Sequence, residues 1–418
     1  MSPRPGRLRR VLALVLVSLP AASVNSMGSF ATPDPVPLPL AQASPGKPID
    51  VTHRRPEQEL MRVLDAMQRG QFGTAQSTLD QLLRDYPNYR LAHLIQGDLL
   101  KARGRPLKTM GDVSEVSPEV LNDLRLEAQV RLKRYTEDAP VDKVPGNILQ
   151  LSSAQRYLLA VDVSRSRLYV YQNDNGTPRR VDDFYITIGK NGYDKRIEGD
   201  QRTPLGVYFV LSQLPKASLP DLYGAAAFPL SYPNEWDRLQ KRTGHGIWLH
   251  GSPSDTYSRP PLSSNGCVAL TNQDLMALSK YLQIGVTPVI ISRDFDWVNA
   301  EQTQQDRDSL LQSLEHWRQD WESRDTRRYL EHYSANFRSG SQDLTAWSAQ
   351  KTAVNASKKW IKVGLSNVSL FRYPDNPDMV VATFEQDYRS DNLSSKGGKR
   401  QYWQREGSGW KIIYEDVS

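Results

Sequence analysis

Residues 157–176, YLLAVDVSRSRLYVYQNDNG, decide the fold of the central part of this chain. Apolar and polar side chains alternate along this stretch and turn residues interrupt it, which is the pattern of paired β-strands. A helix is expected after Thr271, because Asp274 three residues later makes a capping-box-like pair. Residues 153–293 are therefore predicted to form a mostly β domain with few helices. Four further strand-like runs support this, at 182–189 (DDFYITIG), 204–211 (PLGVYFVL), 246–251 (GIWLHG) and 287–292 (TPVIIS).

The residues before this domain have helical periodicity. Residues 57–136 are predicted to be α-helical and to resemble one or two tetratricopeptide repeats, whose period is about 34 residues. A plain helical bundle is the alternative, because repeat arrays normally need three or more units. Residues 27–56, rich in Pro, Ala and Ser, are predicted to be an extended linker. The positions that match the repeat are Gly70, Phe72, Ala75, Leu79, Leu82, Pro87, Ala92 and Gly104.

The residues after this domain, 303–418, are predicted to form an α+β domain. A long amphipathic helix is expected from Asp306, followed by a shorter helix and then by strands to the C-terminus. The segment resembles the SnoaL-like, nuclear-transport-factor-like cone fold, which serves several unrelated functions. Its aromatic residues are expected to fill the core of the cone; a platform that stacks glycan rings is the alternative. They include Trp317, Trp321, Tyr329, Tyr333, Phe337 and Trp410.

The first 26 residues are predicted to be a secretory signal peptide. Four arginines precede an apolar run from Val11 to Leu19, which is too short to span a bilayer. An uncleaved anchor or a buried helix is the alternative. Cleavage places the protein in the periplasm or cell envelope, and no later segment reaches 18 consecutive apolar residues, so no integral membrane span is expected.

Removal of the predicted signal peptide changes what the net charge of the chain implies. The 418 residues include 53 basic and 47 acidic side chains, a net charge of +6. Residues 1–26 hold four of the arginines and no acid, so their removal lowers the net charge from +6 to +2. A charge of this size does not support nucleic-acid binding.

The chain has one cysteine and six histidines. A single cysteine excludes an internal disulfide framework, a zinc site made of several thiolates and an iron–sulfur cluster. The histidines are not spaced as metal ligands, and the sequence contains no glycine-rich phosphate loop and no dinucleotide fingerprint. No metal and no cofactor are therefore expected.

The stretch with catalytic chemistry is His250-Gly251 followed by residues 263–270, SSNGCVAL. A free thiol is mostly protonated at neutral pH, so Cys267 needs a nearby base, and histidine can take its proton and later return it. Gly266 removes side-chain bulk beside the cysteine, so that substrate can approach and the N–H groups of Gly266 and Cys267 can face an oxyanion. The alternative is that the lone cysteine is a small buried hydrophobe.

Three motifs in this order, TPLGVYFV (203–210), HGIWLHGSP (245–253) and SSNGCVAL (263–270), resemble the L,D-transpeptidase catalytic (YkuD-type) domain. The resemblance implies a β-sandwich-like domain that acts on peptidoglycan stem peptides. Cys267 would attack the carbonyl of the residue before a terminal D-amino acid, and an amine acceptor would resolve the thioester. His250 would be the base and then the acid. The substrate-side candidates are His245, Gly251, Ser264 and Asn265.

Two positions depart from the family pattern. Ala269 stands where many members have Arg or Asn, and Asn265 stands where His is also common. A guanidinium at position 269 would bind a substrate carboxylate. Because this chain has alanine there, two alternatives to a transpeptidase stay open. The enzyme would be an L,D-carboxypeptidase or a hydrolase that releases wall-linked partners, or the domain would be a non-catalytic peptidoglycan-binding scaffold. The helical and cone domains are expected to bind envelope or wall-synthesis proteins.

Overall fold

The centre of the molecule is a five-stranded sheet with both faces buried. Its order is β5-β4-β3-β13-β7; β3 and β13 are parallel and the other neighbours are antiparallel. The sequence prediction of these strands is confirmed. They are β3 (Tyr157–Asp162), β4 (Arg167–Asp174), β5 (Thr177–Tyr185), β7 (Gly206–Phe209) and β13 (Pro288–Ser292).

Strand β3 shows how the two faces are used. Leu159 and Val161 belong to the core of the catalytic domain, and Leu158 and Ala160 belong to a second core on the other face of the sheet. All four side chains are 0% exposed. The alternation in this strand therefore separates two buried faces and does not mark one buried and one solvated face.

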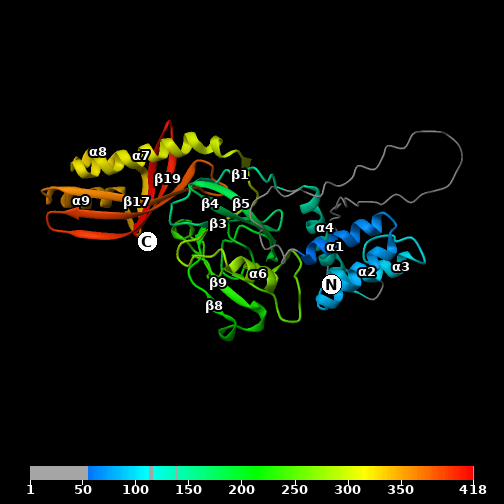
Figure 1. The fold of residues 1–418 in the computed structure, drawn as a ribbon. Helices are drawn as coiled ribbons and strands as arrows, with labels where there is room; N and C mark the ends of the chain where they lie inside the picture. Colours follow the sequence, from blue (N-terminus) through cyan, green and yellow to red (C-terminus); the bar gives the residue numbers. More distant parts are fainter. Residues whose placement is uncertain (1–54, 113–115, 138, 418) are drawn as a thin grey trace, which may run out of the picture.

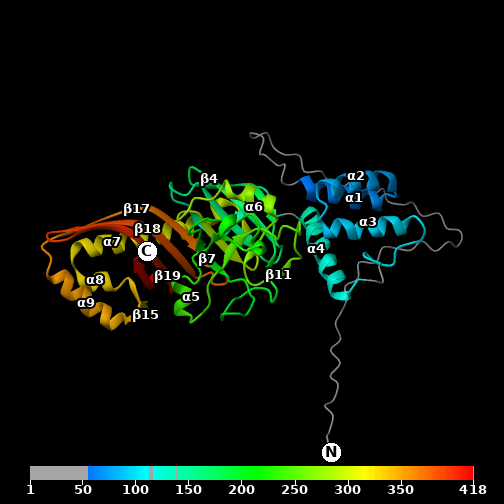
Figure 2. The same ribbon diagram turned by 90° about the horizontal axis from the view of Figure 1, so that it is seen from below.

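The computed structural model describes residues 55–112, 116–137 and 139–417 (Figure 1). The predicted signal peptide, 1–26, and the predicted linker up to residue 54 lie outside these residues. Figures 1 and 2 show the described parts in a row, with the mostly β domain between the N-terminal helices and the C-terminal domain. The predicted multidomain architecture is confirmed.

A second, smaller sheet covers the first face and completes a sandwich. Its order is β12-β10-β9-β8. Helix α6 (Asn272–Ser279) packs on β9 and β10, and Thr271 caps it by accepting a hydrogen bond from Asp274 N–H at 3.0 Å, as the sequence predicts. The remaining elements here are β6 (Ile188–Gly189), β8 (Leu214–Pro215), β9 (Ala226–Pro229), α5 (Glu235–Leu239), β10 (Trp248–His250), β11 (Leu262–Ser264) and β12 (Val268–Ala269).

The C-terminal domain is a seven-stranded sheet of order β16-β15-β20-β19-β18-β17-β2. Helix α7 (Gln304–Ser323) packs on β17, β2 and β20, and α8 (Thr326–Leu330) and α9 (Leu344–Ala356) complete the cone. The strands after α7 are β15 (Tyr333–Ser339), β16 (Gln342–Asp343), β17 (Ile361–Arg372), β18 (Met379–Ser390), β19 (Ser394–Glu406) and β20 (Gly409–Val417).

The segment just before the catalytic domain belongs partly to the cone. Strand β2 (Ile148–Gln150) pairs with β17, and β1 (Val144–Pro145) pairs with β14 (Trp297–Val298). The sequence analysis did not assign residues 137–152 to any domain. Because β2 joins the cone sheet ahead of β3, the chain enters the catalytic domain from an edge of its neighbour.

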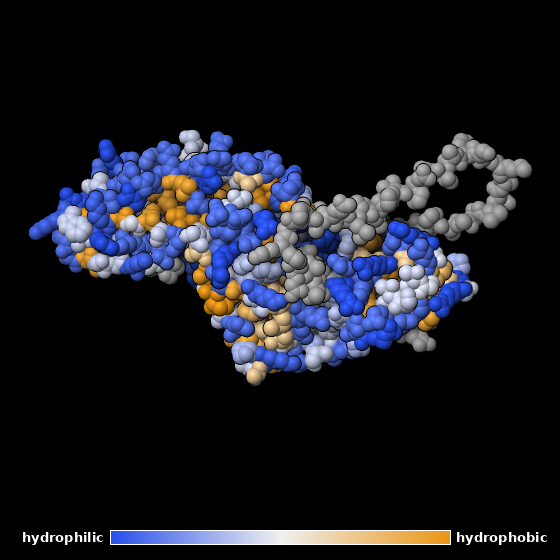
Figure 3. Space-filling view, in the orientation of Figure 1, coloured by the Kyte–Doolittle hydropathy of each residue, from blue (hydrophilic) through white to orange (hydrophobic). Residues whose placement is uncertain are grey.

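The aromatic residues of the cone form its core, as predicted. Each of the six side chains named above is at most 6% exposed. A surface platform for glycan rings is therefore excluded for these residues. Figure 3 shows a largely hydrophilic surface on the visible face, with apolar side chains gathered beneath α7 and along an edge of the central domain.

Four helices form the N-terminal unit. Helices α1 (Arg55–Gln68) and α2 (Phe72–Asp85) pack together across a turn at Gly70, whose φ of +70° suits glycine. Helix α3 (Arg90–Ala102) follows, and α4 (Pro118–Thr136) lies between this unit and the central sheet. After α3, no described helix begins until Pro118, so the second helix of a second repeat does not follow α3 directly. The tetratricopeptide assignment stays a prediction.

Buried charges join the helical unit to the catalytic domain. Arg131 of α4 is 3% exposed and lies 3.0 Å from both Glu127 and Glu57. Arg167 of β4, 2% exposed, lies 2.7 Å from the same Glu57 carboxylate. The Arg131 guanidinium also lies 3.8 Å from the centroid of the Tyr185 ring. Ion pairs at such a depth hold two surfaces in one register, because separating them leaves charges buried without partners.

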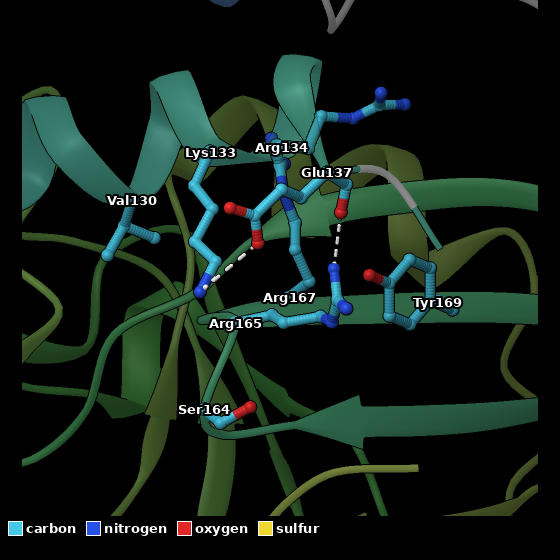
Figure 4. A pocket seen from close by; sticks show the side chains of 8 residues that line it. All are labelled: Val130, Lys133, Arg134, Glu137, Ser164, Arg165, Arg167 and Tyr169. Atoms are coloured by element: carbon cyan, nitrogen blue, oxygen red, sulfur yellow. Dashed lines mark hydrogen bonds and ion pairs between the residues drawn. The ribbon is translucent and has the colours of Figure 1, made fainter. Parts of the chain in front are cut away.

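A small cavity of about 20 Å³ lies at this junction (Figure 4). Lys133 Nζ lies 3.4 Å from the Glu137 carboxylate, and the Arg165 guanidinium donates to the Glu137 carbonyl. Two of the cations that line this cavity are thus bonded to Glu137, and the lining contains neither Cys267 nor His250. None of the helices in the described part of the chain combines the length and apolarity needed to cross a bilayer.

We predict that Arg131→Ala weakens the attachment of α4. The substitution leaves Glu127 buried without its partner, so the opening free energy of α4 should fall by about 3–5 kcal/mol. Native-state hydrogen exchange of the amides in 118–136 measures this quantity. The matched control is Arg55→Ala, which removes the ion pairs of an arginine that is 55% exposed and should cost much less, because solvent screens exposed pairs. Equal losses in the two variants would contradict the prediction.

Candidate active site

The strand pairing of β10 and β12 brings His250 and Cys267 together. The two strands are parallel, with Leu249 opposite Val268 and His250 opposite Ala269. Because opposed residues in a sheet point to the same face and side chains alternate along a strand, His250 and Cys267 share one face. Leu249 and Val268 point to the other face and are 0% exposed in the core. The residues that sequence analysis named as nucleophile and base are therefore neighbours.

The Cys267 thiol is nearly buried, with 9% of the residue exposed. It donates a hydrogen bond to the Gly246 carbonyl, with Sγ 3.2 Å from the oxygen. Burial raises the pKa of the thiol to about 11, against smaller lowering effects of the Trp248 N–H, Arg259 and Lys195. Cys267 is therefore a thiol at neutral pH.

The His250 imidazole is also buried, and its orientation is set by the backbone. Its Nδ1 lies 2.7 Å from the Gly251 carbonyl oxygen, which accepts only if Nδ1 carries the proton. This tautomer leaves Nε2 with a free lone pair to accept a proton. Burial lowers the pKa of His250 to about 4, and the bond to Gly251 opposes this shift. The Tyr223 ring packs edge-on against the imidazole, with centroids 5.1 Å apart.

Ser264 and Gly266 shape the turn before the cysteine. Ser264 Oγ donates to the Cys267 carbonyl at 2.6 Å and accepts from Gly266 N–H at 3.1 Å. A Cβ on Gly266 would lie 2.8 Å from the Arg202 carbonyl oxygen, and its φ of +119° disfavours any side chain. Ser264 is 1% exposed and therefore stabilises the turn from its buried side. Because the Gly266 N–H already donates to Ser264 Oγ, the Cys267 N–H remains as the candidate oxyanion donor.

Gly251 is required by a close approach of Asn272. The Asn272 side chain accepts from Ala225 N–H at 2.8 Å and donates to the Ser252 carbonyl at 2.9 Å. A Cβ on Gly251 would lie 2.1 Å from Asn272 Oδ1. Glycine after the histidine thus lets the Asn272 side chain join its own segment to those of Ala225 and Ser252.

The loop between His250 and Cys267 is attached to the helical unit. Ser258 Oγ donates to Glu127 of α4 at 2.7 Å. The Tyr257 ring lies 4.5 Å from Tyr89 and 4.9 Å from Tyr86, centroid to centroid. A groove of about 200 Å³ separates the rest of this loop from the corner between α2 and α3. Its lining consists of Asp85, Tyr86, Pro87, Asn88, Ser254, Thr256, Tyr257, Asn272 and Gln273.

Two of the predicted substrate-side residues lie on the surface. His245 is 83% exposed and its Nδ1 lies 3.5 Å from the Glu198 carboxylate. Asn265 is exposed at the tip of the turn. Within the described ranges, no group of three or more His, Cys, Asp or Glu side chains is arranged to hold a metal ion.

Several residues of this site were not identified from the sequence: Tyr223, Gly246, Trp248, Arg259 and Asn272. Gly246 and Trp248 stand in the same GIWLHG run as the histidine, and the spacing of two between Trp248 and His250 could have placed Trp248 on the face of the strand that His250 uses. Tyr223 and Asn272 come from other segments and have no local signal, because only the tertiary fold brings Tyr223 to the imidazole and Asn272 to Gly251.

The cone contains a second buried group of charged side chains. Lys399 Nζ lies 2.5 Å from Glu415, whose carboxylate also accepts from Tyr333 and Gln401 at 3.1 and 2.7 Å. Burial alone would raise the pKa of Glu415, but the ammonium groups of Lys399 and Lys351 hold it below its usual value. Burial lowers the pKa of Lys351 to about 8.

Known families and structures agree with this architecture. The L,D-transpeptidase catalytic domain matches residues 156–291, and the Cds6 C-terminal NTF2-like domain matches residues 309–416. The structure of Bd1075 from Bdellovibrio bacteriovorus is 31% identical, with a TM-score of 0.58 over 66% of this chain and 98% of Bd1075. The helical cell shape determining protein Pgp2 from Campylobacter jejuni is 26% identical, with a TM-score of 0.56 over 65% of this chain and 95% of Pgp2. A comparison with curated proteins found no match.

We predict that Gly251→Ala destabilises the catalytic domain. The new Cβ displaces Asn272 and leaves buried polar groups without partners, at a cost of about 1–3 kcal/mol. Proteolysis across a urea series measures the loss. Gly97→Ala is the control, because a Cβ at this helical position meets nothing within 4 Å and should be neutral or stabilising. A Gly251→Ala protein as resistant as the control would contradict the contact with Asn272.

We also predict the pH dependence of Cys267 alkylation. Since the thiol has a pKa of about 11, its alkylation by iodoacetamide should accelerate about tenfold per pH unit from about pH 7 to pH 10. Cys267 is the only cysteine, so the label reports this site alone. Protein unfolded in urea is the control and should level off above a pKa of about 8.5. A plateau of fast alkylation between about pH 5 and pH 8 would instead indicate a thiolate–imidazolium pair.

Proposed function

We propose that this chain, which belongs to the family of proteins with an L,D-transpeptidase catalytic domain and a C-terminal NTF2-like domain, is an acyl-transfer enzyme that acts on peptidoglycan stem peptides. The observation that carries the proposal is the register of β10 and β12, which sets Cys267 beside His250 on one face. A buried thiol next to an imidazole with a free Nε2 has the parts of a nucleophile and its base.

The first half-reaction forms a thioester. Nε2 of His250 takes the thiol proton as Sγ of Cys267 attacks the carbonyl carbon of the residue before the terminal D-amino acid. The S–C bond forms, the carbonyl oxygen becomes an oxyanion, and the C–N bond then breaks. The proton held on Nε2 passes to the nitrogen of the departing D-amino acid.

The electrostatics of the site support general-base chemistry over a preformed ion pair. Burial keeps both partners neutral, with a pKa of about 11 for Cys267 and about 4 for His250. Charge therefore develops only as the bond forms, and the Cys267 N–H is the donor we assign to the oxyanion. A donor of this kind typically contributes about 10²–10³ in rate.

The second half-reaction transfers the acyl group to an amine. The acceptor nitrogen gives its proton to Nε2 of His250 and attacks the thioester carbon, and the thiol is restored by that proton. The products are a new amide bond, in a cross-link or an attachment to the wall, and free enzyme.

Water is the second candidate acceptor. Ala269 is 1% exposed and its backbone bonds to Thr187 in both directions, at 2.8 and 2.9 Å. A methyl group at this buried position cannot bind a substrate carboxylate as a guanidinium would. This departure from the family pattern keeps an L,D-carboxypeptidase or a hydrolase as the second candidate. Both candidates share the thioester.

We place this activity in the periplasm or cell envelope. The basic residues and apolar run of the first 26 residues support export, although they lie outside the described part of the chain. The name of Pgp2 as a helical cell shape determining protein supports a role in shaping the wall. The helical unit and the cone are proposed to bind envelope or wall-synthesis proteins.

The test is incubation of the mature protein with purified sacculi, followed by mass analysis of the muropeptides. New diaminopimelate cross-links indicate an amine acceptor; loss of a terminal residue or of a linked protein indicates water. Cys267→Ala should give neither product, and His250→Ala should slow acylation by about 10²–10⁴.

The matched control is His93→Ala, which changes an exposed histidine on α3 whose Nε2 bonds to the Pro87 carbonyl. It should process sacculi at the wild-type rate. Identical products from wild type and Cys267→Ala would leave only the non-catalytic scaffold.

A further inference from the structure

Arg259 carries a guanidinium with no acidic partner beside the candidate nucleophile. It lies in the loop between His250 and Cys267 and is half-buried. Its Nη2 donates to the carbonyl of Ser263, the residue next to Ser264 at the start of the cysteine turn. No carboxylate of the described residues lies within ion-pair distance of this guanidinium. Its remaining donors are available to a ligand.

The backbone of Arg259 is held in place from the catalytic domain. Its carbonyl accepts from the Tyr185 hydroxyl at 2.8 Å and from Thr187 Oγ1 at 3.1 Å. Thr187 is the residue that exchanges both backbone hydrogen bonds with Ala269. Arg259 is therefore attached through one residue to the position where many family members carry their own guanidinium.

The preceding residues of the loop are held from the other side. Ser258 bonds to Glu127 of α4, and Tyr257 packs on Tyr86 and Tyr89. Helix α4 and the segment between α2 and α3 thus contact the two residues before Arg259. A side chain whose neighbours are fixed on both sides loses little further entropy when it binds a ligand.

The other cation near the cysteine is already engaged. Lys195 acts on Cys267 electrostatically, but its Nζ lies 2.8 Å from Asp200 and 3.0 Å from the Ile197 carbonyl. Arg259 interacts electrostatically with both Cys267 and His250. Burial lowers the pKa of Arg259 below its usual value, yet a guanidinium remains charged at neutral pH. It is thus a positive charge that an anionic group of the substrate can pair with.

We propose that Arg259 binds the free C-terminal carboxylate of the stem peptide. The inference rests on the proposed function and names its substrate class: stems that end in an uncapped D-amino acid. A guanidinium fork matches a carboxylate with two parallel hydrogen bonds. The carboxylate lies one residue beyond the scissile bond, so Arg259 sets the distance from the chain end at which Cys267 attacks.

This assignment changes what Ala269 implies for substrate binding. Arg259 supplies from the loop the charge that position 269 lacks, so the site keeps its means of reading a carboxylate. Stems extended through the terminal carboxyl group lose the ion pair and are poor donors. The enzyme is therefore selective for chain ends.

The experiment measures binding in the inactive Cys267→Ala protein, so it does not depend on turnover. The probes are the tetrapeptide L-Ala-γ-D-Glu-diaminopimelyl-D-Ala and the same peptide with a C-terminal amide. We expect the free acid to bind about 10- to 100-fold more tightly than the amide. In Cys267→Ala/Arg259→Gln this ratio should fall to about one, and in Cys267→Ala/Arg259→Lys it should be intermediate, because lysine keeps the charge and loses the fork.

The matched control is Arg196→Gln in the same background, since Arg196 is 75% exposed and paired with Asp194. It should keep the full ratio. Equal binding of acid and amide before Arg259 is changed, or a full ratio in Arg259→Gln, would overturn the inference. Failure of the free acid to bind would overturn it as well.

Turnover by the active protein separates this inference from the proposed function. If both peptides are cleaved with equal kcat/KM, the enzyme assignment stands and the role of Arg259 falls. If the acid binds selectively but nothing is cleaved, Arg259 keeps its role in a binding domain.

Discussion

Burial of the central sheet on both faces is the constraint on which the rest of the molecule depends. Leu159 and Val161 of β3 need the small sheet and α6 to cover them, while Leu158 and Ala160 need the cone. Both faces of the sheet must be covered, because an apolar sheet face left in water costs about 25 cal/mol for each Å² exposed. The cone is therefore part of the support of the catalytic domain, and β2 strengthens this union by pairing with β17.

The active site uses the rigidity that follows from this burial. Parallel strands β10 and β12 fix Cys267 relative to His250 through backbone hydrogen bonds, and Gly251, Ser264 and Gly266 fill positions where larger or apolar residues would break the geometry. The site is also dry enough to keep both reactive groups neutral. Such a site has no ion pair at rest and is suited to the single proton transfer that the proposed thioester formation requires.

The helical unit takes part in the site through the loop that follows His250. Glu127 receives Ser258 and also pairs with Arg131, so the same carboxylate serves the junction of the two domains and the loop. A substitution that loosens α4 is therefore felt at Arg259, within the loop that leads back to Cys267.

The sequence by itself determined most of the strands and helices of this protein and named its two candidate reactive residues. These signals are local patterns: the alternation along 157–176, the cap at Thr271 and the motifs around His250 and Cys267. A local pattern depends only on residues close together in the chain, so it can be recognised before the packing of the segments is known. Only the tertiary structure decided which distant segments complete them. The pairing of β2 with the cone, the position of Asn272 behind Gly251 and the attachment of Arg259 near Ala269 depend on contacts between residues far apart in the chain. Periodicity reports that a residue is buried, whereas the folded structure decides which residue lies against it.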